Sequence, residues 1–303
     1  MAPRLGLGGG VSADPASGLF GAPNLLLDNY PNAHRAYSVR KLSKDYTGYA
    51  MKVRESSGDY TADVAFDDDG FVSASSKTYN ATGGGFSDGD TLTTFMSSND
   101  GFVTVWYDQS GEGSNATQST ALAQPKLWGS SGGLNTEGSP AIAALLFDGS
   151  NDYMAIDEAG LNFGYATACA VISHTDATGT AVWSLSSDGY FLHYKNGSED
   201  QLWYDSGDSA SHSESTSQKL FSYTTGSGSD QQILYANGVA SSEKGDSSRS
   251  GSFGDDAHNG LGTLWSYSLF YPGEFQEFIV YDSDQRSNLS SIESDINTAF
   301  SIY

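Results

Sequence analysis

Aromatic side chains in the second half of the chain are the residues whose types could contact a ligand most directly. Indole and phenol rings stack on apolar surfaces such as the C–H faces of sugars, and their polar tips form hydrogen bonds. Side chains alternate between the two faces of a strand, so about half of such rings would fill a core instead. We expect a carbohydrate-binding surface that draws on Trp183, Trp203, Tyr204, Trp265 and Tyr271.

Metal chemistry has fewer candidates. Calcium is bound by about 6–8 converging oxygens. Three acidic clusters could supply some of them, namely Asp67–Asp69, Asp148 with Asn151 and Asp152, and Asp255–Asp256. The first is better suited to a solvated turn, and the second to a turn held by its own Asp and Asn side chains. No cofactor is expected apart from calcium.

Histidines and phosphate-binding loops give no further motif. The five histidines show no spacing typical of metal ligands; they are His34, His174, His193, His212 and His258. The sequence also lacks a P-loop and a G-x-G-x-x-G segment that follows a strand. We assign no catalytic residue from these patterns.

Composition excludes several classes of partner. The 37 Asp and Glu residues against 14 Lys and Arg residues give a formal net charge of −23. Nucleic acid requires cationic contacts to its phosphates, and anionic membrane surfaces attract basic segments. No apolar run approaches the roughly 20 residues of a membrane span, and the single cysteine, Cys169, cannot form an internal disulfide. We expect neither nucleic acid nor a membrane as a partner.

The elements that must position these residues are short strands. Runs rich in Val, Tyr, Phe and Thr alternate with Gly, Ser, Asn and Asp turns. They lie at 49–54, 60–66, 102–107, 144–147, 167–173, 180–185, 189–194, 201–204, 219–224, 231–236, 261–265 and 274–281. Asn237-Gly238 predicts a type I′ hairpin turn. The pattern predicts an all-β protein, a concanavalin A-like antiparallel β-sandwich (jelly roll).

Helices and domain limits follow from the remaining segments. A short helix is predicted at 90–96, and a C-terminal helix at Arg286–Phe300 begins near Ser287 or Asn288. Its apolar residues at helical spacing should pack on the sandwich; they are Leu289, Ile292, Ile296 and Phe300. We expect one domain over 30–303, preceded by an extended arm over 1–29. The arm carries Leu5, Leu7, Leu19 and Phe20, which we expect to order against an assembly partner.

One loop is the most specific mark in the chain. Residues 106–118 run from a strand end into a tight turn, because Asp and Asn bond their own backbone and Gly supplies positive φ. Its structural residues are Tyr107, Asp108, Gln109, Ser110, Gly111 and Asn115. Upstream are Ala36-Tyr-Ser-Val-Arg-Lys-Leu42 and Tyr46-Thr-Gly-Tyr-Ala-Met-Lys-Val-Arg54, and downstream is Phe147-Asp-Gly-Ser-Asn-Asp-Tyr153.

In this order the segments resemble the catalytic domain of the α-L-arabinofuranosidase B family, and the part after Phe147 is also similar to a laminin-G domain. The resemblance implies a nucleophilic Glu in an Asp-x-Glu-Asn-Gly stretch and an acid/base Asp in a Gly-Gly-Asp strand. The nearest counterparts of the first are Lys195–Asp200 and Leu202–Gly207, and residues 257–273 contain no carboxylate for the second. The family's adjacent cysteine pair is also missing. The resemblance therefore implies a retained scaffold that has lost its catalytic pair.

These expectations lead to a function without catalysis. We expect a virion structural protein of a bacteriophage, attached through its arm to capsid or tail proteins, forming a homo-oligomer and binding host-surface glycans. The absence of an apolar signal-peptide core near the N-terminus favours this location over an extracellular one. The alternatives are a secreted or surface lectin domain and an active arabinofuranosidase.

Overall fold

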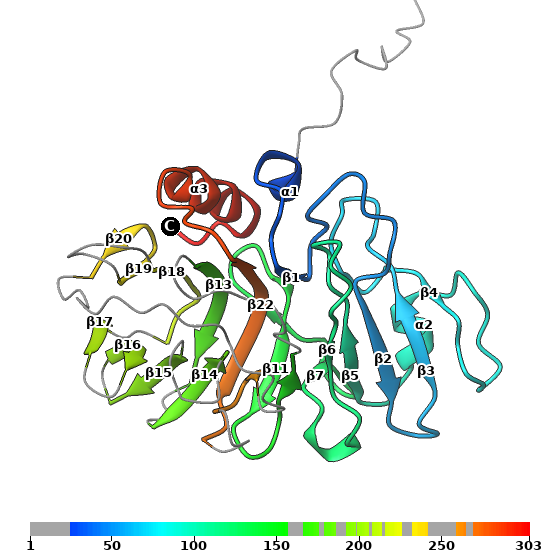
Figure 1. Ribbon diagram of the computed structural model, residues 1–303. Helices are drawn as coiled ribbons and strands as arrows, with labels where there is room; N and C mark the ends of the chain where they lie inside the picture. Colours follow the sequence, from blue (N-terminus) through cyan, green and yellow to red (C-terminus); the bar gives the residue numbers. More distant parts are fainter. Residues whose placement is uncertain are drawn as a thin grey trace, which may run out of the picture.

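Short apolar runs form antiparallel strands in a computed structural model of the chain. The structure describes residues 25–156, 166–175, 179–185, 192–197, 199–205, 208–213, 216–225, 232–241, 259–264 and 269–303. Of residues 192, 196, 203–205, 208 and 209 it describes the backbone alone. The predicted fold class is confirmed, since the chain is an all-β antiparallel sandwich with a C-terminal helix (Figure 1).

The first layer of the sandwich is centred on the longest strand, β22. In pairing order its strands run β1, β22, β13, β18, β19 and β20, and β11 also pairs with β22. Their bounds are β1 Arg35–Ser38, β11 Leu145–Asp148, β13 Thr167–His174, β18 Lys219–Thr224, β19 Ile233–Ala236, β20 Val239–Ala240 and β22 Pro272–Tyr281. Asn237 and Gly238 connect β19 to β20 with φ of 52° and 75°, as a type I′ turn requires.

The second layer faces the first across the core. Its pairing order is β12, β21, β14, β15, β16 and β17. The bounds are β12 Met154–Ala155, β14 Thr180–Ser184, β15 Leu192–Asn196, β16 Glu199–Asp205, β17 Asp208–Ser213 and β21 Gly260–Leu261. Ring contacts join the layers, with Trp183 of β14 lying 4.9 Å from Tyr223 of β18 and 5.4 Å from Phe278 of β22.

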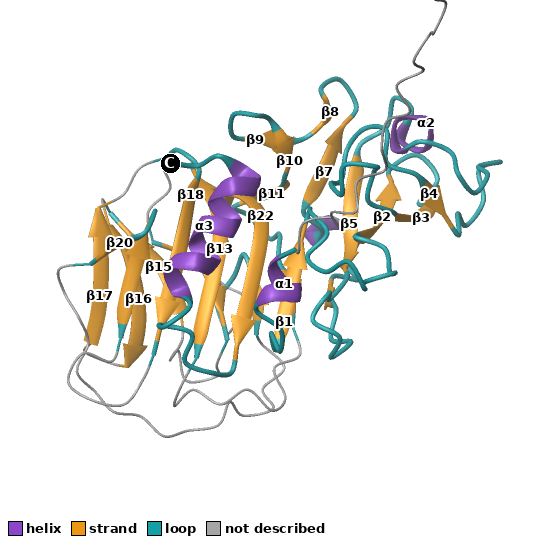
Figure 2. Cartoon of the chain, turned by 90° about the horizontal axis from the view of Figure 1, so that it is seen from above, coloured by secondary structure: helices purple, strands orange, loops and turns teal. Residues whose placement is uncertain are grey.

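The N-terminal strands connect the two layers at one side of the sandwich. They are β2 Met51–Glu55, β3 Thr61–Val64, β4 Thr78–Tyr79, β5 Gly101–Trp106, β6 Ala116–Thr117, β7 Lys126–Gly129 and β8 Gly133–Leu134. β6 pairs with β12 of the second layer, and β7 pairs with β11 of the first. A separate hairpin, β9 Thr136–Glu137 and β10 Ile142–Ala143, lies near β11 and β22 (Figure 2).

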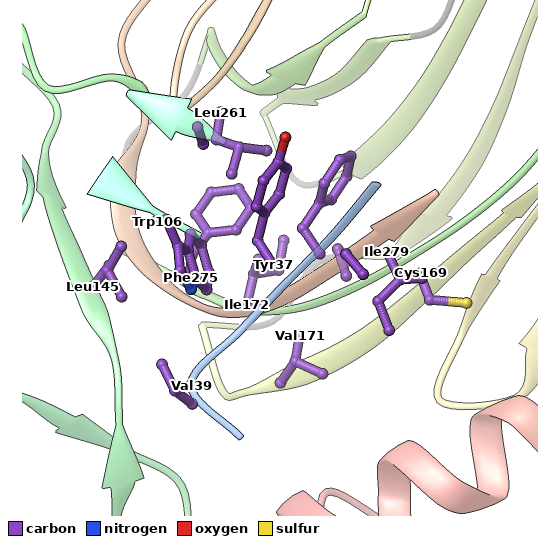
Figure 3. Packing of buried hydrophobic residues seen from close by; sticks show 14 of the residues in the cluster. Tyr37, Val39, Trp106, Leu145, Cys169, Val171, Ile172, Leu261, Phe275 and Ile279 are labelled. Carbon is purple, nitrogen blue, oxygen red and sulfur yellow. The ribbon is translucent and has the colours of Figure 1, made fainter. Parts of the chain in front are cut away.

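One continuous apolar core runs through both groups of strands. Figure 3 shows Tyr37, Trp106 and Phe275 within it, three rings from widely separated parts of the chain. Cys169 is buried in the same cluster as a free thiol. The apolar area that this core removes from water is the main favourable contribution to folding.

Two helices, α1 Leu26–Asn29 and α3 Leu289–Phe300, contact each other, and α3 packs on β18 of the first layer (Figure 1). The short helix α2 Leu92–Met96 lies beside β3 and β4, and the 3-10 turn η1 Ala121–Ala123 lies between β6 and β7 along the chain. The predicted stripe of α3 is buried, and Asn288 occupies the N-cap position. None of the described helices is long and apolar enough to cross a membrane.

A buried group of charged side chains, here called the arginine network, joins α3 to the sheet. It consists of Ser38, Arg40, Glu277 and Asp295. Arg40 Nε donates to Glu277 Oε2 at 2.8 Å and Nη2 donates to Oε1 at 3.1 Å. Ser38 Oγ donates to Glu277 Oε2 at 2.7 Å, and Arg40 Nη1 donates to Asp295 Oδ1 at 2.9 Å. Both oxygens of Glu277 are therefore paired inside the protein.

The predicted arm differs from the structure at its end. Leu26 and Leu27 are buried in α1, and the backbone of Leu27 donates to Leu42 O at 2.8 Å. Residues 25–29 thus belong to the packed domain, because their leucines find a surface within the same chain. Residues Leu5, Leu7, Leu19 and Phe20 lie outside the described residues, so their role in assembly stays a prediction.

Candidate functional site

The loop at residues 106–118, which carries the family resemblance, holds β1 and the segment after it in place through hydrogen bonds. Asp108 Oδ1 accepts from the backbone of Ala36 at 2.9 Å, and Gln109 Oε1 accepts from Leu42 N at 2.9 Å. Gln109 Nε2 donates to Arg40 O at 2.9 Å. Further bonds within or near the loop involve Tyr107 with Asp63, Ser110 with Asp108, and Asn115 with Asp108; Gly111 has φ of 96°. The loop therefore positions structure and holds no reactive group.

The aromatic residues predicted to bind sugar do not form one surface. Trp183 and Tyr271 are fully buried, so the prediction that their rings stack on a ligand is wrong. Trp183 lies on β14, where every residue is buried, and Tyr271 directly precedes β22 with its ring packed against His174 and Phe275. Trp203 and Tyr204 lie on β16 and their side chains are not described, while Trp265 lies outside the described residues.

The acidic clusters considered for calcium are turns. Asp67 Oδ1 accepts from the backbones of Asp69 and Phe71, each at 3.0 Å. Asp148 Oδ1 accepts from the backbone of Ser150 at 2.8 Å, and Asp152 Oδ2 accepts from that of Asp148 at 3.0 Å. Burial, together with the nearby charge of Asp148, raises the pKa of Asp152 to about 7. Residues 255–256 lie outside the described residues.

The carboxylates implied by the resemblance are split between surface and core. Glu199 is exposed at the start of β16, whereas Asp200, its neighbour, is completely buried. Asp205 ends β16, and its side chain is not described. Residues 259–264, on and beside β21, contain no carboxylate.

Histidines that seem unrelated along the chain meet between the two layers. His174 ends β13 of the first layer, while His193 on β15 and Asp200 on β16 belong to the second. Asp200 Oδ1 lies 2.7 Å from His174 Nε2 and 2.9 Å from His193 Nε2, and all three side chains are buried. Tyr223 of β18 completes what we call the histidine cluster, with its hydroxyl 2.5 Å from His193 Nδ1.

The electrostatics of the histidine cluster are strongly perturbed. Burial raises the pKa of Asp200, but the contacts with His174 and His193 outweigh it and hold the pKa well below its usual range. Burial lowers the pKa of His193 despite the nearby carboxylate. Burial also raises the pKa of Tyr223 well above its usual value, and the charge of Asp200 adds to this. Such perturbed groups are often found at functional sites.

The sequence alone does not predict this cluster, because its members come from four strands in two layers. The available signal was local: His174 directly follows the predicted strand 167–173, and His193 lies within the predicted strand 189–194. Spacing could not pair them, because the register between layers is set by tertiary packing.

A second group of titratable side chains is partly exposed to solvent near the start of β22. Glu137 on β9 and Glu274 on β22 are both half-buried, and we call them the carboxylate pair. Burial raises the pKa of Glu137, and the charge of Glu274 raises it further. Glu274 Oε2 accepts from Ser173 Oγ at 2.5 Å, which fixes the carboxylate on the sheet. Gln276 Nε2 donates to Glu137 O at 3.3 Å and so anchors the hairpin.

Tyr271 connects the carboxylate pair to the histidine cluster. Its hydroxyl donates to Ser173 O at 2.5 Å, and its ring lies 5.4 Å from the ring of His174. Burial raises the pKa of Tyr271 well above its usual value, and Glu274, Asp200 and Glu137 raise it further. Tyr271 therefore interacts with members of both the carboxylate pair and the histidine cluster.

Two described pockets lie elsewhere. One, of about 590 Å³, lies between α1, α3 and the loop before Phe71, with Arg40 and Asp295 in its wall. The other, of about 360 Å³, is lined by Tyr46, Phe66 and neighbouring residues. Neither includes the carboxylate pair or the histidine cluster, so the pockets are separate features of the described surface.

Solved structures with a similar fold are arabinofuranosidases. An arabinofuranosidase complexed with arabinofuranosyl-α-1,2-xylobiose matches with a TM-score of 0.62 at 16% identity. A GH54 α-L-arabinofuranosidase soaked with a cyclic sulfate inhibitor matches with a TM-score of 0.63 at 14% identity. A glutamate-to-glutamine variant of a GH54 enzyme, soaked with 4-nitrophenyl α-L-arabinofuranoside, gives the same values. Each match covers 88% of this chain but only 63% of the other.

These likenesses correct the expected function. No protein-family profile and no curated protein sequence matches the chain. The expectation of a non-enzymatic phage structural protein, with a lectin as its alternative, is contradicted because the similar structures are glycoside hydrolases. The related expectation that the chain is not an enzyme is contradicted by the same finding. At these identities the fold is shared, and activity is a separate question.

Proposed function

We propose that this chain is a glycoside hydrolase that cleaves α-L-arabinofuranosides. The observation that carries the proposal is the carboxylate pair, two electrostatically coupled and half-buried glutamates on a fold shared with arabinofuranosidases. Glycosidases use two carboxyl groups on either side of the scissile bond, one of them an acid.

The roles follow from the surroundings of each glutamate. Glu137 has a raised pKa because burial and a neighbouring negative charge disfavour its ionised form. That shift suits a general acid, which must hold its proton until the leaving oxygen takes it. Glu274 accepts a hydrogen bond from Ser173 that fixes its orientation, so it suits the nucleophile or the base.

Neighbouring side chains hold the two glutamates in position. Tyr271 anchors the backbone of Ser173, and Ser173 in turn orients Glu274. A catalytic carboxylate needs such support because small displacements of a reacting group reduce the rate sharply. Gln276 performs the same task for the strand that carries Glu137.

Hydrolysis of 4-nitrophenyl α-L-arabinofuranoside tests the proposal. The unchanged protein should release nitrophenol well above buffer, and Glu274→Gln should lower kcat by about 10²–10⁴-fold. Glu137→Gln should lower the rate by a smaller factor with this substrate, because nitrophenol leaves readily without an acid. Glu199→Gln is the matched control, since Glu199 is exposed on a strand end and should leave the rate unchanged.

A further variant separates this proposal from the position that the resemblance suggests. Asp205→Asn should retain activity if the carboxylate pair is catalytic. Loss of activity in Asp205→Asn with retention in Glu274→Gln would move the active site to the end of β16. An unchanged protein with no turnover of this or other arabinofuranosides would reject the proposed function.

A further inference from the structure

The histidine cluster leaves buried polar atoms without partners. Among the residues that the structure describes, His174 Nδ1 and Nε2 and Asp200 Oδ2 have no hydrogen bond. His174 Nε2 approaches Asp200 Oδ1 to 2.7 Å but not with hydrogen-bond geometry. A buried polar atom that loses water without gaining a partner destabilises the protein. The cluster is therefore incomplete as a purely structural arrangement.

The same atoms are suitably placed for a metal ion. One nitrogen from each imidazole and one oxygen of Asp200 lie within 4.8 Å of one another. Zinc binds such nitrogen and carboxylate ligands at about 2.0–2.2 Å in tetrahedral geometry, which places ligand atoms roughly 3.3 Å apart. The measured separations of 2.7 and 2.9 Å need only a small outward shift of the side chains.

We propose that His174, His193 and Asp200 bind one zinc ion between the two layers of the sandwich. The three side chains supply three ligands, and a water molecule completes the tetrahedron, as in zinc sites with three protein ligands. The ion would join β13 of the first layer to β15 and β16 of the second. This inference does not depend on the proposed hydrolase activity.

Tyr223 has the position of a supporting residue in this site. Histidines that bind zinc usually engage their second ring nitrogen in a hydrogen bond, which fixes the orientation of the ring. The Tyr223 hydroxyl lies 2.5 Å from Nδ1 of His193, opposite the nitrogen that faces Asp200. Tyr223 is thus a positioning residue, not a ligand.

The test measures zinc bound by the full chain after refolding with zinc, because the site is closed to solvent in the folded protein. Plasma mass spectrometry after dialysis should find one zinc per chain. His193→Gln and Asp200→Asn should bind none. His212→Gln, a histidine on β17 outside the cluster, is the matched control and should keep one zinc. Tyr223→Phe should also keep one zinc, with an affinity about 10–100-fold weaker in competition with a chromophoric chelator.

A measurement on the unchanged protein keeps the proposal testable if the core variants do not fold. Refolding with cobalt should give the visible absorption of a tetrahedral ion, and added zinc should abolish it. An unchanged protein that retains only traces of zinc and shows no such absorption overturns the proposal. Retention of one zinc by a folded His193→Gln variant overturns it as well.

Discussion

The arginine network and the histidine cluster are both buried and polar, yet they differ in how completely their atoms are paired. In the arginine network, both oxygens of Glu277 and three nitrogens of Arg40 are hydrogen-bonded within the protein. In the histidine cluster, both ring nitrogens of His174 and Asp200 Oδ2 make no hydrogen bond among the described residues, although His174 Nε2 lies 2.7 Å from Asp200 Oδ1. A fully paired network needs nothing further, whereas an incomplete one indicates a missing ligand.

The carboxylate pair represents a third arrangement, because Glu137 and Glu274 are partly open to solvent. Both glutamates are only half-buried, whereas His174 and Asp200 are buried between the two layers, where only a small ion taken up during folding would fit. Burial and hydrogen bonding thus differ among the three groups, and we base the proposed zinc site and the proposed catalytic pair on those differences.

Breaking the arginine network should give the largest effect on stability. Arg40→Met leaves the buried Glu277 and the partly exposed Asp295 without their cation, which should reduce the free energy of unfolding by about 3–5 kcal/mol, mainly through Glu277. Urea unfolding measures this loss. The double variant Arg40→Met with Glu277→Leu should recover much of it, because the unpaired charge is then removed. A single-variant loss below about 1 kcal/mol, the value of a surface pair, would contradict the structural role.

Asp152 differs from the carboxylates of the arginine network, because it is a buried acid that forms no ion pair among the described residues. Its pKa is about 7 in the folded protein against an ordinary value of 3.8. The folded state therefore binds the extra proton, so stability is lost as pH rises from about 4 through 7, by roughly 4 kcal/mol at most.

Asp152→Asn should consequently be more stable than the unchanged protein at pH 8, and the difference should disappear near pH 4. Asn keeps an oxygen that accepts from the backbone of Asp148. Denaturant unfolding over this pH range tests the expectation, with the exposed Asp68→Asn as control. Equal stability of Asp152→Asn and the unchanged protein at both pH values would show that Asp152 ionises normally.

Zinc should stabilise the protein through the histidine cluster and not through the arginine network. At a zinc concentration one hundred times Kd, the free energy of unfolding should rise by about 2.7 kcal/mol. Arg40→Met should gain as much as the unchanged protein, although it starts from lower stability, and His193→Gln should gain nothing. An equal gain in both variants would mean that zinc binds elsewhere.

Removing a hydrogen-bonding side chain from the loop at residues 106–118 should reduce stability by a smaller amount. Gln109→Ala leaves the buried Leu42 N–H and Arg40 C=O without their partner, at a cost of about 1–3 kcal/mol. Glu112→Ala, an exposed change in the same loop, should cost nothing measurable in thermal unfolding. A neutral Gln109→Ala would show that the loop does not hold β1.

Local chemistry explains the part of the fold that the sequence predicts. The type I′ turn at Asn237-Gly238 needs residues that tolerate positive φ, and the apolar stripe of α3 has helical spacing. By contrast β17, Asp208–Ser213, was not predicted, because Ala210 is its only apolar residue. It exists because its backbone pairs with β16, a long-range interaction that composition does not encode.

The candidate site depends almost entirely on such long-range pairing. The sequence suggests Trp183 and Tyr271 as surface residues, but the packing of the two layers buries both rings. His174 and His193 meet only because two layers pack face to face, and Glu137 meets Glu274 only because a short hairpin lies against β22. Periodicity assigns residues to strands, and packing decides which of them meet.

The proposed hydrolase activity is tested most directly by a crystal structure of Glu274→Gln soaked with 4-nitrophenyl α-L-arabinofuranoside. We expect intact substrate near the start of β22, with its glycosidic oxygen within hydrogen-bond distance of the Glu137 carboxyl group and its anomeric carbon beside residue 274. A substrate bound beside Asp205 at the end of β16, with Glu137 and residue 274 free of contact, would contradict it.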